Sequence, residues 1–370
     1  MKRTLILSIA AALAMSGGLL SGQTAPTIEF EANASPLTMP DNIHLGEVAG
    51  VATNSRGEIY VYTRTGNPTI TIGTARAVSH GGGRLFQFDR NGKYMREIGQ
   101  GVYGFLQPQQ VRVDPQDNIW VVDQMSTQVI KFDPNGRVQM VLSRKPEAMT
   151  VPAPRLTPLP TNIATIQPEP PAAPPRAGGP PPGPPGAGVE GESFVRPTDV
   201  AWDGQGNIYV ADGYGNARVA KYDSNGKWLK NWGSRGSGQG QFNIVHGIAI
   251  DAQGNVYVGD EGNKRVQVFD GEGTFKTQFT NVGAPTALCM TRGPRQVLYV
   301  AHTGDPDGME DAAIYKIDLK GTVLGKFGSA GKLPKEFSLV NAIDCRSENE
   351  LLVGELANWR VQKITLRGVK

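Results

Sequence analysis

Short runs in which apolar and polar residues alternate recur along most of the chain. Representative runs are "IYVAD" at 208–212, "RVAKY" at 218–222 and "WLKNW" at 228–232, and Gly, Asn and Asp residues separate them. An alternation of period two is typical of β-strands with one face buried, and the separating residues are those that hairpin turns require. The pattern therefore predicts an all-β protein built from short antiparallel strands.

The runs belong to a larger repeat. Six copies of an apolar run, a "QGN"-like turn, an "IYVAD"-like run and an "RVxxFD"-like run can be aligned, and they begin near Gly46, Gln107, Arg196, Val245, Ala284 and Val340. Where no insertion intervenes, the copies are about 40 to 55 residues apart, which is the length of a propeller blade. Because one blade cannot bury both of its faces, the six copies predict a single six-bladed β-propeller over residues 23–370.

The two ends of the chain indicate how such a ring would close. The last copy contains only three strand-like runs before the chain stops at Lys370. Near the start, "TIEFEANA" at residues 27–34 alternates but belongs to none of the six copies. We expect this segment to pair with the last blade as its fourth strand, which would remove an open sheet edge.

Two segments fall outside the repeat. Residues 1–22 have a basic start, an apolar run and small residues at the end, which predicts a cleaved signal peptide and a secreted or periplasmic protein. A membrane anchor is the alternative, although the apolar run is short. Residues 146–188 are mostly Pro, Ala and Gly, and we expect them to form a disordered loop. That loop is either a passive spacer or a docking site for a proline-binding partner.

Composition narrows the possible partners. The net charge is +3, and two of the positive charges, Lys2 and Arg3, lie in the leader. A nearly neutral mature chain argues against nucleic-acid and anionic-membrane partners. With only Cys289 and Cys345, the chain is not a disulfide scaffold. We expect a monomer that binds a small carboxylate, a peptide or another protein.

In a propeller, the starts of the inner strands and the ends of the second strands surround one mouth of the central channel. The inner-strand starts are predicted at Ala49, Gln109, Thr198, His246, Thr286 and Asn341. The second-strand ends are predicted at Thr63, Asp123, Asp212, Asp260, His302 and Glu355. A repeated acid at a strand end has an architectural explanation, because its carboxylate can accept backbone N–H groups of the adjacent loop.

Residues that depart from the repeat are better functional candidates. His246, Arg64 and Tyr214 all depart from it and all converge on the predicted mouth. Each also has a structural explanation: a satisfied polar residue, an ion pair or loop packing. His302 replaces an acid and precedes an acidic loop at 303–311, whose "DPDG" matches only part of a calcium loop. His80 lies in an insertion of the first copy and is within possible reach of the same mouth.

The phrases "ADGYGNARV" at 211–219 and "GQFNIVHGIAID" at 240–251 carry a family resemblance. They resemble NHL-repeat propellers, and more narrowly the peptidyl-α-hydroxyglycine α-amidating lyases and their bacterial relatives. That resemblance implies a six-bladed propeller with a zinc ion held by three histidines, a catalytic tyrosine and an arginine. It implies a reaction that splits a C-terminal hydroxyglycine into a peptide amide and glyoxylate.

The resemblance carries over only in part. His246 matches one zinc histidine, Tyr214 the catalytic base and Arg64 the arginine, whereas Gln109 and Asn341 stand in the other two histidine positions. Neutral amides are poor zinc ligands, and Ala342 replaces an aspartate that the family places near a central structural ion.

We therefore expect a propeller that binds a ligand at its mouth through Arg64, Gln109, Asp212, Tyr214, His246 and Asn341, with a degenerate zinc site and no cofactor. The alternative is a working lyase in which Arg64 and Tyr214 are catalytic and the metal site, for zinc or calcium, is rebuilt around His246 and His302. A third possibility is an interaction module that acts through the Pro-rich loop.

Overall fold

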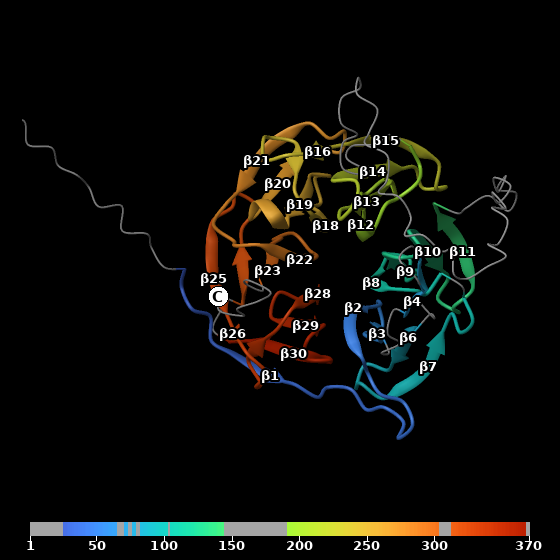
Figure 1. The fold of residues 1–370 in the computed structure, drawn as a ribbon. Helices are drawn as coiled ribbons and strands as arrows, with labels where there is room; N and C mark the ends of the chain where they lie inside the picture. The colour runs from blue at the N-terminus through green and yellow to red at the C-terminus, as the bar shows by residue number, and fades with distance from the viewer. Residues whose placement is uncertain are drawn as a thin grey trace, which may run out of the picture.

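The computed structural model describes residues 25–64, 70–72, 76–78, 82–102, 104–143, 191–302 and 312–367. Six four-stranded antiparallel sheets surround a central axis, and one edge strand of each sheet lies nearest to that axis (Figure 1). The predicted six-bladed propeller is therefore confirmed. The leader at 1–22 and the Pro-rich segment at 146–188 lie outside the described residues. No helix within the described ranges is long and apolar enough to cross a membrane.

The four strands of each blade follow one another from the channel to the outer edge of the ring. Blade 1 contains β2 (Glu47–Thr53), β3 (Ile59–Arg64), β6 (Gly83–Phe88) and β7 (Tyr94–Ile98), and blade 2 contains β8 (Pro108–Val113), β9 (Ile119–Asp123), β10 (Gln128–Phe132) and β11 (Val138–Leu142). Blade 3 contains β12 (Pro197–Trp202), β13 (Ile208–Asp212), β14 (Arg218–Tyr222) and β15 (Trp228–Trp232), and blade 4 contains β18 (Val245–Ile250), β19 (Val256–Asp260), β20 (Arg265–Phe269) and β21 (Phe275–Phe279). Blade 5 contains β22 (Pro285–Met290), β23 (Leu298–His302), β24 (Ala313–Ile317) and β25 (Val323–Phe327), and blade 6 contains β28 (Val340–Asp344), β29 (Glu350–Glu355), β30 (Arg360–Leu366) and β1 (Phe30–Asn33).

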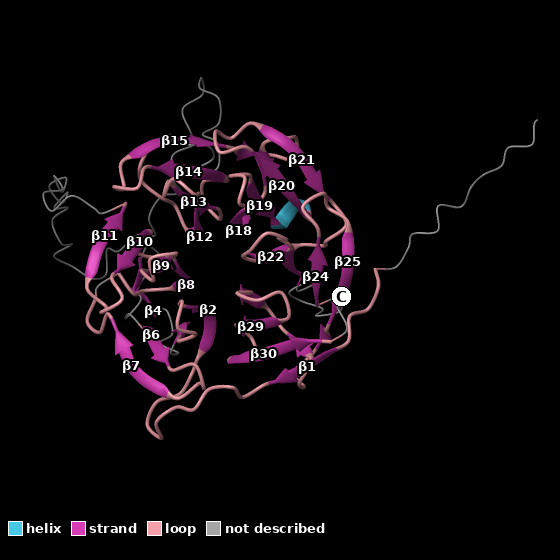
Figure 2. Ribbon diagram, turned by 180° about the vertical axis from the view of Figure 1, so that it is seen from behind, coloured by secondary structure: helices cyan, strands magenta, loops and turns pink. Residues whose placement is uncertain are grey.

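A few short elements decorate this ring. A small hairpin, β4 (Ile70–Ile72) and β5 (Arg76–Val78), interrupts blade 1 between β3 and β6. The connections that enter blades 4 and 6 each contain a short parallel strand pair. In the first, β16 (Ser234–Arg235) pairs with β17 (Gln241–Phe242), and in the second, β26 (Ser329–Ala330) pairs with β27 (Glu336–Phe337). The single 3-10 turn that the described residues contain, η2 (Glu261–Asn263), follows β19 and is the one helix drawn in Figure 2.

The alternating pattern builds a core between blades. The buried apolar residues form six clusters, and each cluster draws its members from two neighbouring blades. The seam between blades 6 and 1, for example, combines Val51 and Phe86 with Leu352 and Val361. Burial of this apolar surface at about 25 cal/mol per Å² is the main force holding the ring together. It also explains why no blade is a separate domain.

The turns between third and outer strands share one chemical device. The Oδ1 atom of an aspartate accepts the backbone N–H groups two and four residues ahead at Asp89, Asp133, Asp223, Asp270 and Asp318. The glycine three residues after the aspartate has a positive φ, such as 84° at Gly92 and 81° at Gly226. Glycine adopts that conformation without a steric penalty, which accounts for the repeated "Asp-x-x-Gly" in the sequence.

The N-terminal segment closes the ring, as the sequence predicts. Strand β1 pairs antiparallel with β30, from Phe30 opposite Leu366 to Asn33 opposite Lys363. On either side of β1 the same segment forms bridges to blade 5, where Thr27 lies beside Lys326, and to blade 1, where Thr38 lies beside Lys93. The first described residues thus run as a belt around the outside of three blades (Figure 1).

An ion pair links the blades across the centre of the channel. The guanidinium of Arg112 in blade 2 donates to both carboxylate oxygens of Asp199 in blade 3, at 2.9 and 2.6 Å. It also donates to the carbonyl oxygens of Leu288 in blade 5 and Ile343 in blade 6. Asp199 in turn accepts the backbone N–H of Ile248 in blade 4. One pair of side chains therefore contacts five of the six blades.

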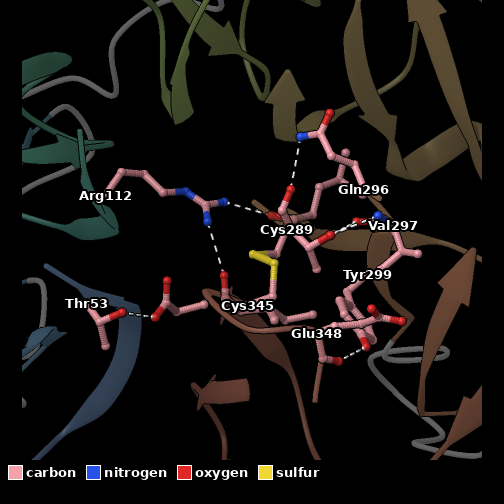
Figure 3. The surroundings of a disulfide bond; sticks show 12 residues. Thr53, Arg112, Cys289, Gln296, Val297, Tyr299, Cys345 and Glu348 are labelled. Atoms are coloured by element: carbon pink, nitrogen blue, oxygen red, sulfur yellow. Dashed lines mark hydrogen bonds between the residues drawn. A yellow bond between two sulfur atoms is a disulfide. The ribbon is translucent and has the colours of Figure 1, made fainter. Parts of the chain in front are cut away.

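A disulfide between Cys289 and Cys345 is the main feature that the sequence did not reveal. Cys289 lies on β22 and Cys345 directly follows β28, so the bond joins the inner regions of blades 5 and 6 (Figure 3). One disulfide does not make the fold a disulfide scaffold, because the hydrophobic core between the blades is complete and the bond only adds to it. The carbonyl groups that receive Arg112 lie next to the disulfide in the same view.

Candidate functional site

A β-bulge marks the start of every inner strand. In each blade the pairing register between the inner and second strands skips a residue, and the skipped residues are those of the predicted ring: Ala49, Gln109, Thr198, His246, Thr286 and Asn341. In blade 4 the skip also includes Gly247. Bulges redirect a side chain out of its ladder and are frequent beside functional sites. Six bulges at equivalent positions place six redirected residues around one channel mouth.

Alternate blades contribute the residues that meet across this mouth. The Gln109 Nε2 atom of blade 2 lies 3.3 Å from the His246 Nε2 atom of blade 4 and 3.5 Å from the Asn341 Oδ1 atom of blade 6. The three side chains are almost fully buried, with exposed fractions of 2%, 5% and 4%. Because the Gln109 amide nitrogen can only donate, His246 accepts on Nε2 and carries its proton on Nδ1 when neutral.

Asn341 anchors this group to the backbone. Its Nδ2 atom donates to the carbonyl oxygens of Ala49 at 2.6 Å and Gln109 at 2.7 Å. The two ring threonines instead face neighbouring blades, Thr198 toward the carbonyl of Val245 and Thr286 toward that of Val340. The polar ring is therefore largely self-satisfied, and its shape is fixed by blade-to-blade hydrogen bonds.

Arg64 lies at the edge of this group, at the end of β3. Its Nε donates to the Pro108 carbonyl at 2.9 Å, its Nη2 to Gln109 Oε1 at 3.0 Å, and its Nη1 to the Glu47 carboxylate at 3.1 Å. Arg64 therefore forms an ion pair, which was the structural explanation that the sequence offered for it. Its partner Glu47 was not among the residues that the sequence singled out. Glu47 could have been found from its position at the start of β2, because that position pairs directly with Arg64 on β3. Among the described residues, one N–H on each terminal nitrogen of Arg64 remains outside these contacts.

Tyr214 is held against His246 by a glycine. The ring centroids of Tyr214 and His246 are 5.8 Å apart at an interplanar angle of 75°, an edge-to-face contact. A Cβ atom at Gly213 would lie 1.6 Å from the Val245 carbonyl oxygen, so only glycine allows this close approach. Burial, aided by Glu261, raises the pKa of the Tyr214 phenol well above its usual value of 10, although the Arg64 charge acts in the opposite direction. The phenol is therefore neutral at physiological pH and is able to donate a hydrogen bond.

The second-strand ends have an architectural role. In all six blades their side chains accept a backbone N–H from the connection that enters the same blade: Thr63 from Gly46, Asp123 from Gln107, Asp212 from Val195, Asp260 from Asn243, His302 from Ala284, and Glu355 from Ser338. Asp212 also accepts from Asn216 and Arg218, and it is fully buried. Both of its oxygens are therefore engaged within the protein, away from the ligand-binding role that the sequence suggested.

His302 has the same role as the acids that it replaces. Its Nδ1 atom accepts the Ala284 N–H at 2.9 Å, and its ring lies 6.5 Å from that of Tyr315 in the same blade. The acidic loop at 303–311 and His80 lie outside the described residues. Within the described residues, no group of three or more His, Cys, Asp or Glu side chains is arranged to hold a metal ion.

The donors at the mouth do not fit zinc. Zinc requires several imidazole, thiolate or carboxylate donors, and this group offers one imidazole lone pair, which already faces the Gln109 amide. The Gln109 oxygen faces the Arg64 guanidinium, and the Asn341 oxygen faces the Gln109 amide. The positive charge of Arg64 further opposes a cation here. What this arrangement can do chemically is to donate hydrogen bonds to an anionic or polar group.

Comparison with known proteins agrees with this architecture. The NHL repeat is recognised at residues 194–222 and 242–269, which fall in blades 3 and 4. The chain is 24% identical to a probable peptidyl-α-hydroxyglycine α-amidating lyase of Caenorhabditis elegans, over 87% of this chain and 83% of that protein. It is 26% identical to peptidyl-α-hydroxyglycine α-amidating lyase 1 of Drosophila melanogaster, over 94% of this chain and 63% of that protein. It is 39% identical to NHL repeat-containing protein 3 of Mus musculus over 29% of this chain and 32% of that protein.

Solved structures share the fold at low sequence identity. A gluconolactonase from Xanthomonas campestris superposes with a TM-score of 0.54 at 12% identity, covering 93% of this chain and 96% of that chain. A streptogramin B lyase superposes with a TM-score of 0.51 at 10% identity, covering 91% of this chain and 98% of that chain. The chain is thus a six-bladed propeller that contains NHL repeats in blades 3 and 4 and whose sequence is similar to amidating lyases.

Proposed function

We propose that the channel mouth binds a ligand with a carboxylate group, such as the free C-terminus of a peptide, and that it does so without a metal ion. The carrying observation is Arg64, a guanidinium fixed by three hydrogen bonds at the edge of an otherwise neutral polar ring. A guanidinium with free N–H groups on both terminal nitrogens suits the two oxygens of a carboxylate. Its side chain is 23% exposed, so a ligand can reach it.

The surrounding residues support binding more than catalysis. The neutral Tyr214 phenol beside His246 can donate a hydrogen bond but is a poor base at physiological pH. The Asn341 side chain ties together the backbone carbonyls of Ala49 and Gln109, and this preorganisation lowers the entropic cost of binding. Truncation of Arg64 should therefore weaken carboxylate binding by roughly 2–5 kcal/mol, as is typical of partly desolvated charge pairs.

The test compares peptide acids with peptide amides. Short peptides of the same sequence, with a free or an amidated C-terminus, are titrated by calorimetry into the wild type and Arg64→Gln. We expect the wild type to prefer the acid and Arg64→Gln to lose that preference. Arg84→Gln serves as the matched control, since Arg84 lies in the same blade and is paired with Glu97. Equal affinity for acid and amide in the wild type would refute the proposal.

A working lyase is the second candidate, favoured by one observation. Arg64, Tyr214 and His246, through which the sequence resembles the amidating lyases, do converge at the mouth. Elemental analysis and glyoxylate release from a peptidyl-hydroxyglycine, measured on one sample, separate the two candidates. We expect less than stoichiometric zinc and no glyoxylate. About one zinc per chain, lost in His246→Ala together with glyoxylate release, would establish the lyase instead.

We further propose that the protein acts outside the cytoplasm as a monomer. Two observations support export: the signal-like leader at 1–22 and the Cys289–Cys345 disulfide, a bond that persists in oxidising compartments. Cell fractionation with N-terminal sequencing of the mature chain tests this, and light scattering tests the oligomeric state. Cytoplasmic protein with an intact leader would contradict it.

A further inference from the structure

The end of the channel opposite the mouth holds a cavity. The inner strands end there, and residues that follow or end all six of them line a cavity of about 260 Å³. Its walls include Ala52 of blade 1, Ile250 of blade 4 and the Cys289–Cys345 disulfide. The cavity is large enough for an ion with a few heavy atoms but too small for a peptide. It lies at the far ends of the same strands that begin at the mouth, so it is separate from the site proposed above.

Three arginine side chains are concentrated in this cavity. Arg112, Arg292 and Arg346 line it together with Asp203 and Asp344. Arg112 is paired with Asp199, and Asp203 is engaged by its own turn through Asn207 and Tyr209. Asp344 accepts the Thr53 hydroxyl. Among the described residues, neither Arg292 nor Arg346 forms an ion pair with a carboxylate.

Arg346 has hydrogen-bonding capacity that its surroundings do not meet. Its Nη2 atom donates to the Thr53 carbonyl, but its Nε and Nη1 atoms are buried and have no acceptor in the described part of the chain. Burial lowers the pKa of this guanidinium; the charge of Asp344 acts in the opposite direction, and the charge of Arg292 lowers the pKa further. Among the described residues, Arg292 donates one side-chain hydrogen bond, to the Val113 carbonyl at 3.5 Å. A buried donor without a partner is costly, and an anionic acceptor would relieve both the missing hydrogen bonds and the repulsion.

We propose that this end of the channel is a binding site for a small oxyanion, held between Arg292 and Arg346. Carboxylate, phosphate and sulfate groups share the required chemistry, since each presents several acceptor oxygens and a negative charge. Arg346 also borders an adjoining cavity of about 510 Å³ at the seam of blades 6 and 1, so its side chain has room to turn toward a bound anion. Thr53, between the two cavities, adds a hydroxyl to the wall.

The experiment titrates sulfate, inorganic phosphate and acetate into the full mature protein by calorimetry, at constant ionic strength maintained with chloride. The variants are Arg346→Gln, Arg292→Gln and Arg295→Gln. Arg295 is the matched control, because it lies on the same exposed turn as Arg292 but does not line the cavity. The comparison of the three anions distinguishes a carboxylate site from a phosphate or sulfate site.

We expect saturable binding of at least one anion, weakened by about tenfold or more in Arg346→Gln and in Arg292→Gln, and unchanged in Arg295→Gln. Should Arg346→Gln fail to fold, Arg292→Gln alone carries the test. Equal binding in all variants, or no saturable binding to the wild type, would overturn the proposal. Arg64→Gln should leave anion binding here intact, so failure at either site is seen independently of the other.

Discussion

The ion pair between Arg112 and Asp199 should be the strongest single tie between blades, and its removal gives a quantitative test of the fold. The perturbation is Arg112→Met, which keeps the length of the side chain but removes its charge and its donors. Four hydrogen bonds are lost: two to Asp199 and one each to the carbonyls of Leu288 and Ile343. The Asp199 side chain, only 2% exposed, is left as a buried charge without its counter-ion.

The expected cost follows from that burial. Loss of one partner of a buried ion pair costs about 3–5 kcal/mol, mostly because the remaining charge is uncompensated. The Arg112 side chain is 13% exposed and borders the far cavity, and Asp199 keeps its backbone donors Val200 and Ile248. These features place the value near the lower end, at about 3 kcal/mol. Asp199→Asn should cost a similar amount, and the double variant clearly less than the sum, with a coupling of about 1–3 kcal/mol.

Urea denaturation at neutral pH measures these values from the midpoint of unfolding, with the slope as a check that the transition keeps its cooperativity. Lys363→Met is the control. Its partner Glu350 is solvent-exposed, so this variant should change the unfolding free energy by less than about 1 kcal/mol. If Arg112→Met costs no more than the control, or if the two single costs simply add in the double variant, the pair does not tie the blades together.

Three further predictions follow from other features. Replacing both Cys289 and Cys345 by serine should lower the unfolding free energy by about 4 kcal/mol, because the bond closes a loop with a sequence separation of 56, and an unchanged melting temperature would contradict this. Sulfate binding at the cavity between Arg292 and Arg346 should strengthen as the pH is lowered toward the pKa of Asp344, which burial raises, because protonation of Asp344 leaves Arg112, Arg292 and Arg346 less compensated. Asp344→Asn should bind sulfate more tightly than the wild type at neutral pH and lose the pH dependence in calorimetry. Deleting residues 151–188 should shift the melting temperature by no more than a few degrees, because Ser143 and Phe194 on either side of that segment are already hydrogen-bonded, and an insoluble product would argue against it.

Features encoded by local sequence were predictable. The alternation of "IYVAD" and "RVAKY" reports strands directly, and the repeat brings Gln109, His246 and Asn341 to equivalent positions without any knowledge of coordinates. The closing strand was also visible, because residues 27–34 alternate but have no partner within a copy. All of these inferences needed only the period of a strand and the symmetry of a ring.

Contacts between blades were not predictable in the same way. Arg112 reaches residues 87, 176 and 231 positions away, and nothing in its neighbourhood along the chain marks it as central. The disulfide had a weak signal. Cys289 is three residues after Thr286, whereas Cys345 is four after Asn341, so strand alternation points the two toward opposite sheet faces and thus toward each other across one interface. Predicting the disulfide from this difference in position requires knowing which blades are neighbours, in addition to recognising the repeat.

The belt formed by the first described residues brings the two ends of the folded chain together. The Arg367 N–H donates to the Glu29 carbonyl at 2.8 Å, so the last described residue lies beside the start of β1. A short linker could therefore join the two ends of the described chain, and new ends could be opened in a connection between two blades, such as residues 280–284 between β21 and β22, without removing any strand from its sheet. Such a circular permutant would make every blade from one continuous stretch of chain. Comparing the cooperativity of its unfolding with that of the parent would show how much the stability of the ring depends on the pairing of the first and last strands in one sheet.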